Sequence, residues 1–172
     1  MSDVFCPDMD ADLNPEVSAA GFQLGVSLSS VMKLIGPVAW YEDNSEIHEL
    51  LGKNSGWIGV KKKSGCQGND AVNLTFKNSC VQLVFEQREI LYQIVVGGAY
   101  SGAFAGVRVG DDLLALQTDF EIDFNDMDDE FLILDKGEYI SGISFVTDHR
   151  ASLLHSPNQI IKHISVHDWR FR

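Results

Sequence analysis

Carboxylates crowd one short stretch of the chain, DFEIDFNDMDDEF, at residues 119–131. Seven of its thirteen residues are Asp or Glu, and none is basic. Three kinds of chemistry use carboxylates in such numbers: binding of a hard cation, acid–base catalysis by a pair of acids, and attraction of a positively charged partner. The apolar residues between the acids help to separate these three possibilities.

A calcium loop is the first possibility. Five residues with side-chain oxygens fall at the loop positions 1, 3, 5, 7 and 12: Asp119, Glu121, Asp123, Asn125 and Glu130. Position 6 of such a loop requires glycine for its sharp turn, and Phe124 stands there instead. Phe120, Ile122 and Phe124 alternate with the acids, which is typical of a strand. We therefore expect a strand with its apolar side in the core and its acidic side outward, and no metal or cofactor.

Catalysis is the second possibility. The chain contains no Gly-x-Ser-x-Gly sequence, and no acid pair within 119–131 stands out from the others. Cys66, in SGCQGN, is a possible nucleophile beside a histidine, although cysteines flanked by glycines are common in turns. The histidines are His48, His149, His155, His163 and His167. We expect a protein without catalytic activity; the alternative is a small hydrolase that uses Cys66 or an acidic pair.

A negative surface is the third possibility. Residues 111–138 hold eleven acids and one base, Lys136, so this segment carries -10 of the chain's formal charge of -12. Like charges this close repel one another, and binding to a basic surface is one reason for a protein to keep them. We predict that the stretch binds a basic protein, with Phe124 and Phe131 as apolar anchors. The predicted partner-binding residues are Asp119, Glu121, Asp123, Phe124, Asp126, Asp128, Asp129, Glu130 and Phe131.

The overall charge favours a protein partner. Nucleic acid and anionic membranes attract basic proteins, so a chain with a net charge of -12 is not expected to bind either. The N-terminus lacks the basic and apolar regions of a secretory signal, and no apolar run reaches the length of a membrane span. An odd set of cysteines, Cys6, Cys66 and Cys80, is typical of free thiols. These features predict a cytoplasmic protein.

Hydrophobic spacing predicts the elements around the acidic stretch. Residues 27–35 have the pattern of a short helix that begins at a capping serine and ends at Gly36. Alternation around Ile164 and Val166 predicts a final strand that continues to Phe171. Four segments rich in Val, Ile, Phe and Tyr predict an antiparallel meander: 56–63, 71–78, 80–87 and 89–98.

The second half of the chain echoes the first. Gly25-Val26-Ser27-Leu28 is followed much later by Gly106-Val107-Arg108-Val109, and residues 56–60 have a counterpart in 130–134. A repeat this small cannot bury its own apolar face, so two copies would pack together.

These patterns predict the fold class and the domain boundaries. We expect one α+β domain over residues 20–172, with an antiparallel sheet and a few short helices. It would contain two pseudo-repeated halves, about 21–98 and 102–148, and a C-terminal strand, with the glycine-rich segment 97–110 as the linker. Residues 1–19 are polar and contain two prolines, and we expect them to form a loosely ordered lead-in.

Taken together, these features resemble the small acidic immunity proteins that bacteria make beside interbacterial toxins, particularly in contact-dependent inhibition and related polymorphic toxin systems. The resemblance covers roughly residues 21–148. It rests on the Gly-Val-x-aliphatic-helix unit at 25–35 and 106–117, the strand GISFVTD at 142–148, the acidic stretch, and the lack of catalytic motifs. It implies a cytosolic inhibitor that covers the active site of one cognate toxin domain, often a nuclease. A peptide-binding adaptor that adds a strand to a sheet edge is a further alternative.

Overall fold

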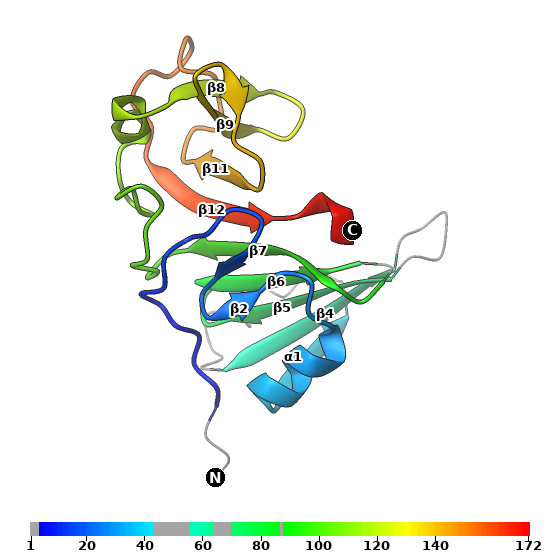
Figure 1. The fold of residues 1–172 in the computed structure, drawn as a ribbon. Coiled ribbons are helices and arrows are strands. Elements are labelled where there is room, and N and C mark those ends of the chain that lie inside the picture. The colour runs from blue at the N-terminus through cyan, green and yellow to red at the C-terminus, as the bar shows by residue number, and fades with distance from the viewer. Residues whose placement is uncertain (1–3, 43–55, 64–69, 87) are drawn as a thin grey trace.

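The computed structural model of the protein describes residues 4–42, 56–63, 70–86 and 88–172 (Figure 1). Within this part of the chain the helices are α1 (Leu28–Ile35) and two short 3-10 helices, η1 (Leu113–Thr118) and η2 (Trp169–Phe171). The strands are β1 (Ser18–Ala19), β2 (Phe22–Gln23), β3 (Val38–Glu42), β4 (Trp57–Lys63), β5 (Asp70–Phe76), β6 (Val81–Phe85), β7 (Leu91–Gly97), β8 (Glu121–Asn125), β9 (Glu130–Asp135), β10 (Glu138–Tyr139), β11 (Ile143–Thr147) and β12 (Ile161–His167).

Ten of these strands form one sheet. Their order is β10-β9-β11-β12-β7-β6-β5-β4-β3, with β8 also paired to β9, while β1 and β2 form a small sheet of their own. Neighbours in the large sheet are antiparallel, except that β3 is parallel to β4. The predicted meander is confirmed in β4–β7. The described fold is thus rich in antiparallel sheet with few helices, and more of it is strand than the predicted α+β class suggests.

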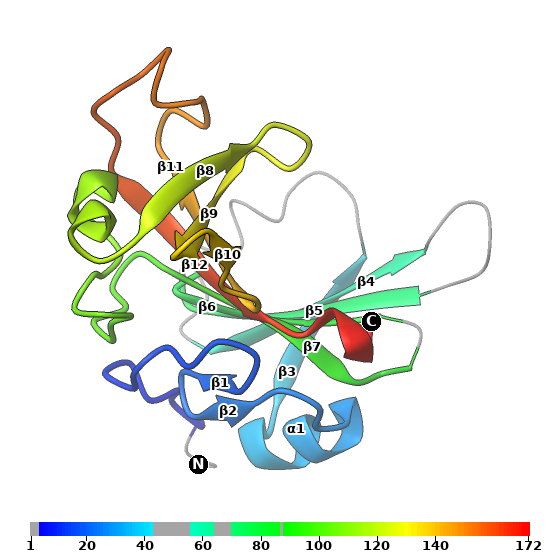
Figure 2. The ribbon, with the colours of Figure 1, turned by 45° about the horizontal axis from the view of Figure 1, so that its top comes forward.

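One face of the sheet forms the hydrophobic core. Along β6, for example, Val81, Leu83 and Phe85 are buried, while the residues between them belong to the opposite face. The N-terminal segment with β1, β2 and α1 packs over the core face of β4–β7 (Figure 2), where the ring centroids of Phe22 and Trp57 lie 5.8 Å apart. A second cover, residues 104–120, packs on the β9–β11 part of the same face.

Helix α1 forms as its sequence predicts. The Ser27 side chain accepts a hydrogen bond from the Ser30 N–H at 3.2 Å and so caps the first turn. Gly36 has a φ of 76°, and its N–H donates to the Met32 carbonyl at 3.2 Å, which ends the helix. Its buried face faces the sheet. No helix among the described residues has the length and apolar character that a membrane crossing requires.

The N-terminal segment differs from its prediction. Residues 4–19 are not a loose lead-in but part of the packed domain, since Leu13 is 3% exposed and its N–H donates to the Ala103 carbonyl at 2.9 Å. The buried Tyr100 hydroxyl donates to the Ala11 carbonyl and accepts from the Ala20 N–H at 3.0 Å. These partners lie about ninety residues away in the sequence, within the glycine-rich segment 97–110, so the local polarity of the lead-in gives no sign of them.

The predicted pseudo-repeat stays a hypothesis. Helices α1 and η1 each follow a capping side chain, Ser27 and Asp112, and these residues form isolated bridges with Ile90 and Ile160, just before β7 and β12. Against this, α1 is an α-helix and η1 a 3-10 helix, and β3 is parallel to β4 whereas β8 is antiparallel to β9.

Candidate partner-binding site

The acidic stretch forms the β8–β9 hairpin. Its side chains alternate as the sequence predicts, because Ile122 and Phe124 pack against the core while Glu121 and Asp123 are exposed. We call its six exposed acids the acidic surface: Asp119, Glu121, Asp123, Asp126, Asp128 and Asp129. The prediction of a strand with an apolar inner side and an acidic outer side is confirmed.

The prediction of Phe131 as an apolar anchor is wrong, and Phe124, the other predicted anchor, is partly buried. Phe131 is 1% exposed, and the ring of Phe124 lies 4.9 Å from it on the core side of the hairpin. The strand register explains this, because Phe124 is directly opposite Phe131 and both therefore point to the same face. The apolar groups that do reach the surface here are Met127, 89% exposed, and Tyr139, 56% exposed.

Hydrogen bonds hold the turn of the hairpin in one shape. The Asn125 amide donates to the Asp128 carboxylate at 3.0 Å, and the Asn125 side-chain oxygen accepts from the Met127 N–H at 3.2 Å. The Tyr139 hydroxyl donates to the Asp123 carboxylate from the neighbouring strand β10. The carboxylates are thus presented on an ordered scaffold, which lowers the entropy that binding would cost.

Glu130 differs from the acids of the acidic surface because its side chain is half-buried. Burial raises the pKa of its carboxyl, and the charge of Asp128 acts in the same direction, while the neighbouring Ser144 and Asn125 side chains oppose the shift. A nearby cation would favour the charged form of this group. Glu130 is therefore placed to gain from a positive side chain brought by a partner.

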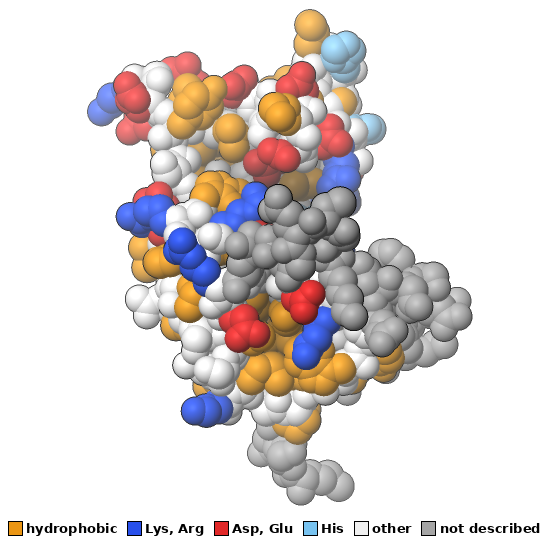
Figure 3. Space-filling view, turned by 90° about the vertical axis from the view of Figure 1, so that its right-hand side faces the viewer, with side chains coloured by type: hydrophobic (Ala, Val, Ile, Leu, Met, Phe, Trp, Pro, Cys, Tyr) orange, Lys and Arg blue, Asp and Glu red, His pale blue; other side chains and the backbone are white. Residues whose placement is uncertain are grey.

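The acidic surface is not neutralised by the rest of the described chain. The ion pairs within that part of the chain join Asp168 to Arg170, Glu86 to Arg172 and Asp148 to His149, and none of them includes an acid of 119–131. In Figure 3 most of the Asp and Glu side chains lie over the upper part of the molecule, where Figure 1 places β8 and β9. The charge of Arg172 acts on Asp128 from a distance, but no described base forms a close ion pair with this surface.

A cleft of about 280 Å³ adjoins the hairpin. One wall comes from the hairpin and the chain after it, and the other from the end of β12 and the C-terminal turn, which we define as residues 167–172. The lining residues are Glu16, Leu132, Tyr139, Ile140, Ser141, Gly142, Ile143, His167, Asp168, Trp169 and Arg170. At Gly142 an added Cβ would collide with the backbone of Glu16, so only glycine allows this close approach of the two segments.

On the C-terminal wall of the cleft, the ionisable side chains are either paired with each other or neutral. The Asp168 carboxylate is 3% exposed and accepts from the Arg170 backbone N–H at 3.0 Å and from the guanidinium at 2.6 Å, which lowers the pKa of Asp168. Burial lowers the pKa of His167 to about 4, so its imidazole is neutral near pH 7. Its ring lies 4.5 Å from that of the half-exposed Trp169.

Sequence reasoning missed this wall. It expected the last strand to continue to Phe171, but β12 ends at His167 and the Asp168 side chain caps η2. The tripeptide Asp168-Trp169-Arg170 could have indicated this capped turn, because Asp is a favoured N-cap residue and a following Arg can reach back to it.

Among the other predicted reactive residues, those that the structure describes do not gather into one site. Cys66 and His48 lie outside the described residues. Within the described residues, no group of three or more His, Cys, Asp or Glu side chains is placed to hold a metal ion. His149 and His155 are exposed on the segment between β11 and β12.

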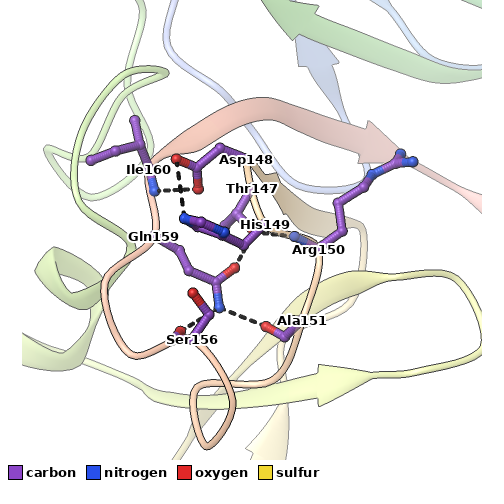
Figure 4. A network of polar contacts seen from close by, with 8 residues as sticks. All are labelled: Thr147, Asp148, His149, Arg150, Ala151, Ser156, Gln159 and Ile160. Carbon is purple, nitrogen blue, oxygen red and sulfur yellow. Dashed lines mark hydrogen bonds and ion pairs between the residues drawn. The ribbon is translucent and has the colours of Figure 1, made fainter.

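The polar network in that segment has a structural role (Figure 4). Gln159, which is fully buried, donates to the carbonyls of Ala151 and Ser156 at 2.6 and 2.7 Å and accepts from the Thr147 hydroxyl. Asp148 accepts from the Ile160 N–H at 3.0 Å. These bonds satisfy buried polar groups and close the loop onto β12.

Comparison with known proteins identifies the fold and no function. No protein-family model matches the chain, and no curated protein matches it. The chain resembles the crystal structure of the uncharacterized protein yfeY from Escherichia coli, with a TM-score of 0.53 and 12% sequence identity. The match covers 92% of this chain and 97% of that one. The two proteins therefore share a fold.

Proposed function

We propose that this chain is a binding protein whose acidic surface docks on a Lys- and Arg-rich surface of another protein. The observation that carries the proposal is the outward row of carboxylates on the ordered β8–β9 hairpin, which form no ion pair within the described part of the chain. Concentrated like charge of this kind costs stability unless a partner neutralises it, and it accelerates encounter with a basic surface.

The mechanism we propose combines steering with short-range contact. The acidic surface attracts and orients the partner, and its carboxylates accept hydrogen bonds from lysine and arginine side chains. Tyr139 and Met127 supply apolar contact in place of Phe131, which is buried, and Phe124, which packs on the core side. The cleft beside Tyr139 is large enough to admit one partner side chain, with Glu16 on its far wall available to a cation.

The more specific proposal is an immunity protein. In this form the basic partner is a toxin domain, most simply a nuclease, because a nuclease active site carries cationic side chains that hold phosphates. The acidic surface would cover that active site in the cytoplasm, and no catalytic step by the inhibitor is needed. The charge of 111–138 and the resemblance of 21–148 to immunity proteins support this form of the proposal.

A capture experiment with matched charge variants tests the proposal. The full chain is immobilised and exposed to lysate of its native cell at low and at high salt, and captured proteins are identified by mass spectrometry. Asp126, Asp128 and Asp129 are changed to Lys together; the control D12K/D70K/E89K makes the same change in net charge at three exposed acids elsewhere.

The expected partner is a basic protein that the chain captures at low salt, and that the hairpin variant loses while the control retains it. With the purified pair, the hairpin variant should lower the association rate at low salt by about 10-fold or more. An unchanged association rate would exclude this surface, and a captured partner without a basic surface would exclude the mechanism.

A further inference from the structure

Three sulfur-containing residues, Cys6, Met9 and Cys80, line one pocket. The pocket has a volume of about 460 Å³ and lies between the N-terminal segment, the β5–β6 turn and the turn after β7. Its lining residues are Cys6, Met9, Phe76, Lys77, Asn78, Cys80, Gly98 and Ala99. We call Cys6, Met9 and Cys80 the sulfur cluster. Neither cysteine forms a disulfide.

The backbone on the N-terminal side of the pocket is fixed by long-range bonds. The Phe5 carbonyl accepts from the Trp57 indole N–H at 2.9 Å, and the Asp8 N–H donates to the Ala20 carbonyl at 3.1 Å. The Met9 carbonyl accepts from the Ser101 N–H at 2.9 Å. Cys6 and Met9 are therefore held against the sheet, although Cys6 is exposed and its side chain is free to turn.

Cys80 is placed by an unusual turn. Lys77, Asn78 and Ser79 all have positive φ angles, a conformation that side chains other than glycine seldom adopt. The turn reverses the direction of the chain. As a result, the Cys80 N–H donates to the Lys77 carbonyl at 2.8 Å, and the Cys80 thiol donates to the Phe76 carbonyl at 3.3 Å. Strain of this kind persists where the surrounding structure enforces it and is common at functional sites.

We propose that the sulfur cluster binds a soft monovalent metal ion of the Cu(I) class, with two thiolates and one thioether as ligands. Thiolate and thioether sulfur select Cu(I), whereas the hard cations Mg²⁺ and Ca²⁺ prefer oxygen. The lining of this pocket includes no His, Asp or Glu side chain, so it does not offer the four nitrogen, oxygen or thiolate ligands typical of structural zinc.

Charge and protons balance in this site. Binding converts one Cu(I) and two neutral thiols into a complex of net charge -1 and releases two protons, with no change of oxidation state. Each thiol must lose its proton to bind the metal as a thiolate. Lys77, whose ammonium lies 5.1 Å from the centre of the Phe76 ring, lines the same pocket and offsets the negative charge of the complex.

Competition for Cu(I) tests the proposal on the reduced full chain without oxygen. The chain is titrated into a complex of Cu(I) with a coloured chelator, bathocuproine disulfonate, and the loss of colour gives stoichiometry and affinity. We expect one Cu(I) per chain and an affinity that rises with pH. Loss of a residue that only supports a metal ligand weakens metal affinity by ~10–100-fold. Loss of a ligand should weaken it at least as much, so C6S and C80A should each lower the Cu(I) affinity by at least this factor, and M9L should lower it less.

Matched variants separate the site from general thiol binding. C66S removes the third cysteine, and this variant should bind Cu(I) as the wild type does. Ag(I), which does not change oxidation state, should raise the melting temperature of the wild type and not of C6S/C80A. C6S also shows whether a loss of binding reflects misfolding. Because Cys6 is exposed, this variant should unfold as the wild type does when no metal is present. Equal Cu(I) affinity in wild type and C6S/C80A, or loss of binding in C66S, would overturn the proposal.

Discussion

Two regions of the molecule, the C-terminal turn and the β8–β9 hairpin, use carboxylates in opposite ways. On the C-terminal turn, Asp168 is buried and bound by Arg170, and nearby Glu86 accepts from the Tyr92 hydroxyl and from Arg172, both at 2.9 Å. On the β8–β9 hairpin, the six acids of the acidic surface have no ion pair within the described residues. The first group of acids holds the fold together, and the second is free for interaction with another molecule.

The difference follows from the neighbours that the chain supplies. The last residues are basic, so the acids that meet them are neutralised within the fold. The segment 111–138 has a single lysine among eleven acids, and strand alternation sends most of those acids outward. If this contrast is right, changes in the C-terminal turn should alter stability, and changes in the acidic surface should alter binding instead.

The largest effect on stability should come from the protonation of His167 at low pH. Its pKa falls from 6.5 in the unfolded chain to about 4 in the folded one. The stability gained by keeping it neutral is complete above 6.5 and is lost as the pH falls toward 4, because the unfolded chain then takes up a proton that the folded chain refuses. The free energy of unfolding should fall by up to roughly 3 kcal/mol across this window.

Urea unfolding at pH values above 6.5 and near 4 measures the effect. H167Q should flatten the pH dependence, and H155Q, a change at an exposed histidine, should not. His163 also has a pKa lowered by burial and adds to the effect with the same sign. If the stability of the wild type stays constant between pH 6.5 and 4, the C-terminal turn tolerates a charged imidazole. That result would weaken the contrast between this turn and the acidic surface.

A smaller loss of stability should follow from Asp168→Ala. The variant removes the side chain that caps η2 and binds the Arg170 guanidinium, and loss of such a cap costs about 1–2 kcal/mol. Asp168→Asn is the matched control, since its side-chain oxygen can still cap the turn. Thermal and urea unfolding at neutral pH give the comparison. Equal stability of Asp168→Ala and wild type would mean that the carboxylates of the C-terminal turn are as dispensable as those of the hairpin.

The smallest effect on stability should come from the acidic surface. Changing Asp126, Asp128 and Asp129 to Asn together removes three repelling charges at exposed positions, so the free energy of unfolding should change by less than about 0.5 kcal/mol or rise slightly. The same variant should weaken capture of a basic partner. A loss of more than about 1 kcal/mol would place these acids among the groups that hold the fold.

The local part of the fold could be predicted from the sequence. Helix α1 has its cap, its apolar face and its terminal glycine within ten residues, and β4–β7 alternate over short, well-separated segments. The inward and outward sides of β8 followed from the alternation of Phe120, Ile122 and Phe124 with acids. In each case the information lies within one element.

The candidate sites depend on pairings that no local window contains. Phe131 fails as an anchor because the β8–β9 register sets it against Phe124 on the core side. The cleft joins residues near positions 16, 140 and 168, and the sulfur cluster joins positions 6, 9 and 80. Tyr100 binds a segment about ninety residues earlier, which turns an apparent lead-in into a cover for the sheet.

The position of β12 in the sheet has a consequence for folding in the cell. This strand follows both of its neighbours in the sequence, yet it lies between β7 and β11 and pairs with both. Until it leaves the ribosome, each of these two strands has an open edge that can pair with another chain. The two parts of the sheet can therefore join only after β12 has been synthesised, and a nascent chain stalled before Ile161 should be prone to aggregation.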